Sequence, residues 1–311
     1  MKKSIAIFVI TVCCSMKQQL AYSQMPDDGF TMSRGELCLV AAYQQTKWTE
    51  YWEGTRRREN KNLGAFTSKA ITPMFGYGIT NKISVFGGLP YIHNSSSAGT
   101  MMGQKGWQDL SMAVKYHALK KTKGKAAWNL FATAGFSVPV SDYPPDFLPF
   151  SIGIGSKTAQ LRLIGHMLHA SNFFATAQAG YVFRSNITVD RTSYYTDAQY
   201  NSNEMRIPDV WNGSVRTGFN NKYFRGDVHY AWSKATSGSD MRMNDMPFPG
   251  NRMEMSAVGI STLIWIAPVN GLAINASADK VVSGRNAGKA FTWMAGVQYV
   301  FKPFNKKNNE K

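Results

Sequence analysis

The sequence predicts an all-β fold, a transmembrane antiparallel β-barrel of about 12 strands with short periplasmic turns and long extracellular loops. Three observations predict it. About a dozen segments near ten residues long alternate apolar and polar side chains, as in residues 290–301, where Phe291, Trp293 and Val297 share one parity. Charged residues within these segments gather on the other parity. The connections between the segments alternate in length.

Each strand is expected where such alternation lies between turn-forming residues. A strand with one lipid-facing side needs near ten residues to cross a bilayer at a tilt. We expect strands at residues 36–51, 66–77, 82–92, 107–119, 126–138, 157–168, 173–184, 209–219, 223–234, 254–266, 271–282 and 289–301.

The connections separate into two sets. Residues 78–81, 120–125, 169–172, 220–222 and 267–270 are short, whereas 52–65, 93–106, 139–156, 185–208 and 235–253 are longer and polar. Residues 283–288 are a short exception. An outer-membrane barrel has this asymmetry, and an even strand number puts both ends of the barrel in the periplasm.

The loop at 139–156 is rich in proline and carries several aromatic residues. We expect it to be a solvent loop that shields strand edges. The alternative is that it folds inward, as a constriction or to gather an apolar solute.

The N-terminus reads as a secretory signal peptide over residues 1–23. Lys2 and Lys3 precede a short apolar core, and Ala21-Tyr22-Ser23 fits the cleavage pattern. The expected organisation is therefore a signal peptide (1–23), a barrel (24–304) and a polar C-terminal tail (305–311), exported to the bacterial outer membrane. Cleavage leaves Cys38 alone, so no disulfide can form within one mature chain.

The chain is basic. Loss of the three lysines in the signal peptide lowers its formal charge from +16 to +13. The basic residues are scattered rather than clustered on a helix, which favours contact with phosphate-rich headgroups or a pore for anions over nucleic acid. We expect as partners outer-membrane lipids, a small-molecule solute and, during biogenesis, the barrel-assembly machinery.

Charged and histidine side chains on the inward parity are the candidate functional residues. An Arg or Lys facing lipid at mid-depth costs about 2–4 kcal/mol, a cost that inward placement avoids. These residues either pair with Asp109, Glu36 and the inward aspartates to fill the barrel, or line a pore that selects anionic or polar solutes. The candidate lumen-lining residues are Lys69, Lys115, His117, Arg162, His166, Arg184, Arg216, Arg225, Asp227, His229 and Asp279.

No motif for catalysis, for cofactor binding or for metal binding stands out, and we expect that the protein is not an enzyme. Gly-Ile-Gly at 153–155 lacks a following helical pattern. His166 and His169 fall on opposite strand faces, which argues against a metal site. An outer-membrane lipid hydrolase would need an outward His beside an outward Ser. His117, His166 and His229 fall on the inward parity instead.

Several hairpins resemble a known family. The resemblance is found in Tyr77–Val85 with Leu89-Pro90-Tyr91, in Trp107–Tyr116, and in residues 136–143 and 153–156. Over about residues 66–165 they are similar to outer-membrane proteins assigned to the MetA pathway of phenol degradation, although Gln108 stands where that family has glycine. The resemblance implies an outer-membrane barrel that passes hydrophobic or aromatic compounds.

The predicted function is therefore a channel or transporter for small solutes. Two alternatives stay open. The first is a structural or surface-interaction barrel with a plugged lumen, and the second is the outer-membrane lipid hydrolase.

Overall fold

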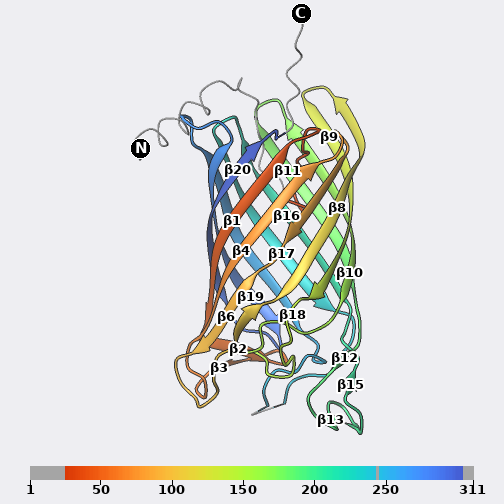
Figure 1. Ribbon diagram of the computed structural model, residues 1–311, viewed down its shortest axis with the longest axis vertical. Helices are drawn as coiled ribbons and strands as arrows, with labels where there is room; N and C mark the ends of the chain where they lie inside the picture. Colours follow the sequence, from red (N-terminus) through yellow and green to blue (C-terminus); the bar gives the residue numbers. More distant parts are fainter. Residues whose placement is uncertain (1–24, 243–244, 304–311) are drawn as a thin grey trace, which may run out of the picture.

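The computed structural model describes residues 25–242 and 245–303, which form a closed antiparallel barrel of 12 strands (Figure 1). β1 pairs with both β20 and β4, which closes the sheet. Two of the 12 strands are interrupted, and each therefore carries two labels. One consists of β5 and β6, and the other consists of β7 and β8. The bounds are β1 Leu37–Trp48, β4 Phe66–Gly78, β5 Ile83–Gly88, β6 Tyr91–Ser96, β7 Lys105–Trp107, β8 Asp109–Lys123, β9 Ala126–Pro139, β10 Thr158–His169, β11 Phe173–Arg184, β16 Val210–Asn220, β17 Phe224–Ala235, β18 Glu254–Trp265, β19 Leu272–Arg285 and β20 Phe291–Phe301.

The two interruptions lie side by side. Pro90, between β5 and β6, has no N–H to donate to a ladder, and its carbonyl accepts the Gln108 amide at 2.9 Å. Beyond this point β6 and β7 pair with each other, and the pairing extends into the segment predicted as the loop 93–106 as far as His93 and Lys105. β8 also runs past the predicted end at residue 119 to Lys123, with a bulge between His117 and Leu119.

The two ends of the barrel differ. Leu37 pairs with Phe301, so β1 begins where β20 ends. That end, named here the short-turn end, holds the connections 79–82, 124–125, 170–172, 221–223 and 266–271. The opposite, long-loop end holds residues 49–65, 97–104, 140–157, 185–209, 236–253 and the short connection 286–290. It also carries β2 Glu50–Glu53, β3 Arg56–Glu59, β12 Ile187–Thr188, β13 Tyr194–Tyr195, β14 Gln199–Tyr200 and β15 Glu204–Met205, at the bottom of Figure 1.

The two faces of the wall alternate as the sequence predicts. On β10, Leu161 and Leu163 are 58% and 61% exposed, whereas Ile164 between outward positions is fully buried. β20 repeats the pattern, with Val297 exposed and Gln298 buried. An outer face of exposed apolar side chains suits lipid, and a closed ladder satisfies the backbone there. Among the described residues, no helix has the length and hydropathy needed to cross a membrane.

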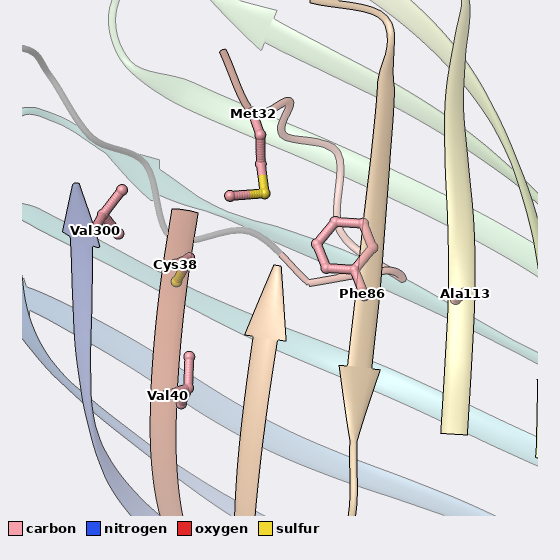
Figure 2. Packing of buried hydrophobic residues seen from close by; sticks show 6 residues of the cluster. All are labelled: Met32, Cys38, Val40, Phe86, Ala113 and Val300. Carbon is pink, nitrogen blue, oxygen red and sulfur yellow. The ribbon is translucent and has the colours of Figure 1, made fainter. Parts of the chain in front are cut away.

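The chain's own N-terminal segment, Met25–Glu36, occupies the barrel interior at the short-turn end. Met32 is 1% exposed and packs against Cys38, Val40, Phe86, Ala113 and Val300 from the surrounding wall (Figure 2). Cys38 is therefore a small buried residue, as the sequence predicts. The predicted signal peptide, Gln24 and the predicted tail 305–311 lie outside the described residues.

Candidate functional site

The barrel interior gathers nearly all of the predicted lumen residues. Lys115 and His166 are each 3% exposed, and Asp227 is 9% exposed, whereas the neighbouring residues on each strand are exposed or half-buried. The same parity holds the remaining inner-face residues: His117 on β8, Arg162 on β10, Arg184 on β11, Arg216 on β16, Arg225 and His229 on β17, and Asp279 on β19. That they line a solute path stays a prediction.

Lys69 is the exception, and its assignment to the lumen is wrong. β4 begins with Phe66 facing inward at 5% exposure, so the odd positions face outward. Lys69 shares the outer face with Ile71 and Phe75, which are 56% and 36% exposed. It lies close to the long-loop end, where a lysine on the lipid face costs only about 0–1 kcal/mol. The cost that drives charges inward at mid-depth is absent there.

Lys115 is the main attachment point of the N-terminal segment. Its Nζ lies 2.8 Å from Asp28 Oδ1 and 2.6 Å from the Asp28 carbonyl. The carbonyls of Phe30 and Met25 accept from the same nitrogen at 2.8 and 3.1 Å. The side chains of the pair are 3% and 5% exposed. A buried ammonium is thus compensated by one carboxylate and three backbone oxygens, all from the N-terminal segment.

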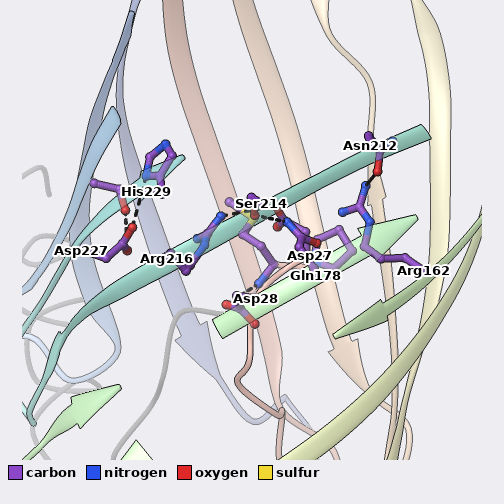
Figure 3. Close-up of polar contacts among 12 residues, drawn as sticks. Asp27, Asp28, Arg162, Gln178, Asn212, Ser214, Arg216, Asp227 and His229 are labelled. Carbon is purple, nitrogen blue, oxygen red and sulfur yellow. Dashed lines mark hydrogen bonds and ion pairs between the residues drawn. The ribbon is translucent and has the colours of Figure 1, made fainter. Parts of the chain in front are cut away.

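Two arginines extend this contact across β16 and β17. Arg216 Nη2 lies 3.7 Å from Asp27 Oδ2 (Figure 3). Arg225 Nη1 lies 3.7 Å from Asp28 Oδ2. The Arg225 guanidinium also lies 4.6 Å from the centroid of the Phe30 ring. Two adjacent acids of the N-terminal segment therefore meet basic side chains from separate parts of the wall.

The backbone of the segment also fits the wall closely. A Cβ added to Gly29 would lie 2.1 Å from the imidazole ring of His166, so this position accepts only glycine without a shift of the ring. Phe30 packs edge-on against His166 and Phe174, with ring centroids 5.0 and 5.6 Å apart. Thr176 holds the His166 ring through a 2.8 Å hydrogen bond.

A second polar cluster lies on β17, β18 and β19. His229 Nδ1 is 3.3 Å from Asp227 Oδ1, and its Nε2 is 2.8 Å from Asp279 Oδ1. Ser261 donates to Asp227 Oδ2 at 2.7 Å. The predicted inward aspartates, Asp227 and Asp279, thus bond to His229. The acids that face Arg216 and Arg225 are instead Asp27 and Asp28, which are absent from the predicted site. The sequence signal for them was Asp-Asp-Gly-Phe, which begins at Asp27, shortly after the predicted cleavage site.

The other two expected partners bond elsewhere. Tyr143 donates to Asp109 Oδ1 at 2.6 Å. Glu36 accepts the Ser33 amide at 2.8 Å. His117 stacks on Phe131, with ring centroids 4.5 Å apart, and its Nε2 lies 3.0 Å from Asn129 Oδ1. Arg162 Nη2 donates to Asn212 Oδ1 at 3.4 Å.

Residues 140–157, named here the inward loop, fold toward the interior, so the prediction of a solvent loop is wrong. Asn94 on the inner face of β6 donates from Nδ2 to the carbonyls of Phe150 and Ser151 at 3.1 and 2.9 Å. Phe150 is fully buried and packs edge-on against Phe66 at 6.0 Å. The wall supplies a polar and an aromatic partner, and the Asn94 amide satisfies loop carbonyls that lie away from solvent.

The inward loop separates two cavities. The mouth cavity, of about 410 Å³, is lined mainly by apolar groups from the loops at the long-loop end, among them Trp48, Leu63, Leu148, Met241 and Met246. A second cavity, of about 480 Å³, is lined by inner-face residues such as Phe66 and Asn94. Leu148, Pro149, Ile154 and Arg184 border both cavities.

Arg184 is the basic residue shared by these cavities. Its Nη1 donates to the Pro208 carbonyl at 3.3 Å, and its Nε is buried without an acceptor among the described residues. Within the same part of the chain its guanidinium forms no ion pair. A cation therefore sits at the junction of the two cavities with hydrogen-bonding capacity left over.

Comparisons with known proteins agree with this architecture. A sequence model of the family described as "Putative MetA-pathway of phenol degradation" matches residues 61–295. A search of curated proteins gave no match. The structure is similar to an outer membrane channel from Pseudomonas putida F1, with a TM-score of 0.67 and 12% identity over 90% of this chain and 100% of that chain. It is less similar to the translocator domain of the autotransporter NalP from Neisseria meningitidis, with a TM-score of 0.47 and 9% identity over 96% of both chains. The likeness to the channel from Pseudomonas putida F1 shows a shared barrel fold.

Proposed function

Because the chain belongs to the family of the MetA pathway of phenol degradation, we propose that it is an outer-membrane channel for small solutes, closed by its own N-terminal segment. The observation that carries the proposal is the occupied lumen. Lys115 is bonded to Asp28 inside the barrel, where an open channel would hold water. Barrels of this kind carry their conduction path through a polar interior.

The contacts of the segment with the wall support a removable closure. Asp28 has one direct ion pair with Lys115, and the arginine contacts of Asp27 and Asp28 are longer, at 3.7 Å. Withdrawal of the segment would take Asp27 and Asp28 away from Lys115, Arg216 and Arg225, and would leave more positive than negative charge on this part of the inner wall. Such a surplus of positive charge in a low-dielectric wall favours anions.

The lining of the mouth cavity favours apolar or aromatic compounds as the transported solutes. Its volume of about 410 Å³ lies in the range of small-molecule sites, and its lining is mainly aliphatic, aromatic and thioether. Arg184 at its inner border supplies one hydrogen-bonding group that could orient a hydroxyl or carboxylate. The route we propose runs from the mouth cavity past the inward loop to the space that the N-terminal segment occupies.

The proposed location is the bacterial outer membrane, with the long-loop end outside the cell and the short-turn end in the periplasm. Export by the signal peptide and insertion by the barrel-assembly machinery belong to this proposal. The exposed apolar outer face supports a membrane location.

A plugged structural barrel is the second candidate, favoured by the same burial of Lys115 and Asp28. In that case the segment never leaves the lumen, and the long loops carry the function.

Planar-bilayer recordings separate the two candidates. We would compare the mature chain with a variant lacking residues 25–34, and use a variant lacking residues 192–201 of an outer loop as a control of equal length. A channel closed by the segment predicts large, stable conductance steps for the first deletion and small or rare steps for the other two proteins. Silence from all three well-folded barrels would contradict a channel, and equal conductance in all three would contradict closure by the segment.

A further inference from the structure

The outer face of the barrel carries a row of basic side chains near the long-loop end. Lys69, His93 and Lys105 are paired directly across β4, β6 and β7. Lys47 of β1 and Lys280 of β19 both pair with Phe291, which lies between them on β20. All five basic side chains are exposed. Because β1 pairs with β4, they form one continuous patch, named here the outer basic row.

Aromatic side chains lie next to this row, on its side toward the barrel centre. Tyr91 and Trp107 pair with each other two residues from His93 and Lys105, toward the barrel centre, with ring centroids 5.3 Å apart. Trp293 pairs with Gln45, two residues before Lys47. Aromatic side chains of this kind gather at the level of lipid headgroups. The lysines therefore reach into the headgroup layer, where their charge is tolerated.

Three lysines of the row have no acidic partner in the part of the chain that the structure describes. Lys47, Lys69 and Lys105 form no ion pair within residues 25–242 and 245–303. The outward positions of the described barrel strands carry no Asp or Glu, since Asp109, Asp227, Asp279 and Glu254 all lie on the inner parity. Several uncompensated cations in one patch favour a ligand with several negative charges.

We propose that the outer basic row binds the phosphates of lipid A, the glycolipid of the outer leaflet of the outer membrane. Lipid A carries phosphates at both ends of a disaccharide, so one molecule presents two separated anionic groups beside its acyl chains. Lys69 and Lys105 stand two strand spacings apart, ~10 Å, which allows one ligand to meet more than one lysine. Its acyl chains would lie along the exposed apolar wall below, which includes Ile71 and Phe75.

The test is lipid binding to the detergent-solubilised mature barrel, followed by native mass spectrometry and by the thermal unfolding midpoint. The ligands are diphosphoryl lipid A, monophosphoryl lipid A and phosphatidylglycerol. The variant is K47Q/K69Q/K105Q. The matched control is K82Q/K121Q/K123Q, which removes three exposed lysines at the short-turn end, where Lys121 pairs with the outward Trp128.

We expect saturable binding of diphosphoryl lipid A, weaker binding of the monophosphoryl form, and weaker binding still of phosphatidylglycerol. At about fivefold per lysine, the triple variant should bind on the order of 100-fold more weakly, and the control should bind as the parent does. K47R/K69R/K105R keeps the charge and should keep binding. If the triple glutamine variant fails to fold, K69Q alone should still weaken binding by about fivefold.

Three results would overturn the proposal. The first is undiminished lipid A binding by a folded triple variant. The second is an equal loss in the control. The third is equal affinity for phosphatidylglycerol, which would mean that the row attracts any anionic headgroup. None of these depends on whether the barrel conducts.

Discussion

At the residue scale, the ammonium of Lys115 ties the N-terminal segment to the wall. It reaches the segment through Asp28 and three backbone carbonyls, and both charged side chains are almost completely buried. Neither charge is stable there alone, since removal of one partner leaves the other desolvated and unpaired. The pair therefore makes Lys115 the strongest of the contacts that hold the segment, beside Arg216, Arg225 and the packing of Met32.

Lys115→Met tests this dependence. Breaking a buried ion pair costs roughly 3–5 kcal/mol, and here the cost can be avoided by release of the segment into water. We expect backbone amides of residues 27–32 to lose most of their protection in hydrogen exchange, while the strands keep theirs. Lys121→Met, on the outer face of the same strand, should leave the protection unchanged. Undiminished protection in the Lys115 variant would mean that apolar packing around Met32 holds the segment by itself.

At the scale of elements, one side-chain amide of the wall binds several carbonyls of the inward loop. Asn94 Nδ2 lies 2.9, 3.1 and 3.4 Å from three consecutive loop carbonyls, those of Ser151, Phe150 and Pro149. Three carbonyls converge on one donor because this stretch of the loop curves around the side chain. The loop is thus bound to a specific position on β6. Held there, it lies between the mouth cavity and the second cavity, which is lined by Phe66 and Asn94.

Asn94→Ala should loosen this loop. The loss leaves buried carbonyls unpaired, at a cost of about 1–3 kcal/mol, whereas the barrel ladder is untouched. Limited proteolysis within residues 140–157 should become severalfold faster, and the thermal midpoint of the barrel should change little. Ser95→Ala, the adjacent residue on the opposite face, is the matched control. An unchanged cleavage rate would assign the position of the loop to its other contacts, such as Phe150 packing and the Tyr143–Asp109 hydrogen bond.

At the scale of the whole molecule, the barrel was predictable because its signals are local. Alternation such as that of Leu161 to Ile164 reports the two faces of a strand within a few residues. The contents of the lumen were not predictable in this way. Lys115 and Asp28 are 87 residues apart, and Asn94 meets Ser151 across 57 residues. Contacts at such separations leave no periodic trace in the chain.

Lys69 marks the limit of the charge argument itself. The penalty for a charge on the lipid face depends on depth, so it constrains mid-strand positions such as Arg216 and Asp227 far more than strand ends. The depth of a residue in the membrane cannot be read from the sequence. The structure supplies it through the exposed outer position of Lys69 near the long loops.

The central claim is that the N-terminal segment closes the barrel by meeting Arg216, Arg225 and Lys115. The most direct test is to add a synthetic peptide of residues 24–34 to barrels that lack this segment and to record the current under a salt gradient. We expect the truncated barrel to prefer anions, and the peptide to block its current from the short-turn side only. R216S/R225S should shift the reversal potential toward cations and weaken the block about tenfold or more. A truncated barrel that ignores the peptide, or a double variant blocked as readily as its parent, would contradict the claim.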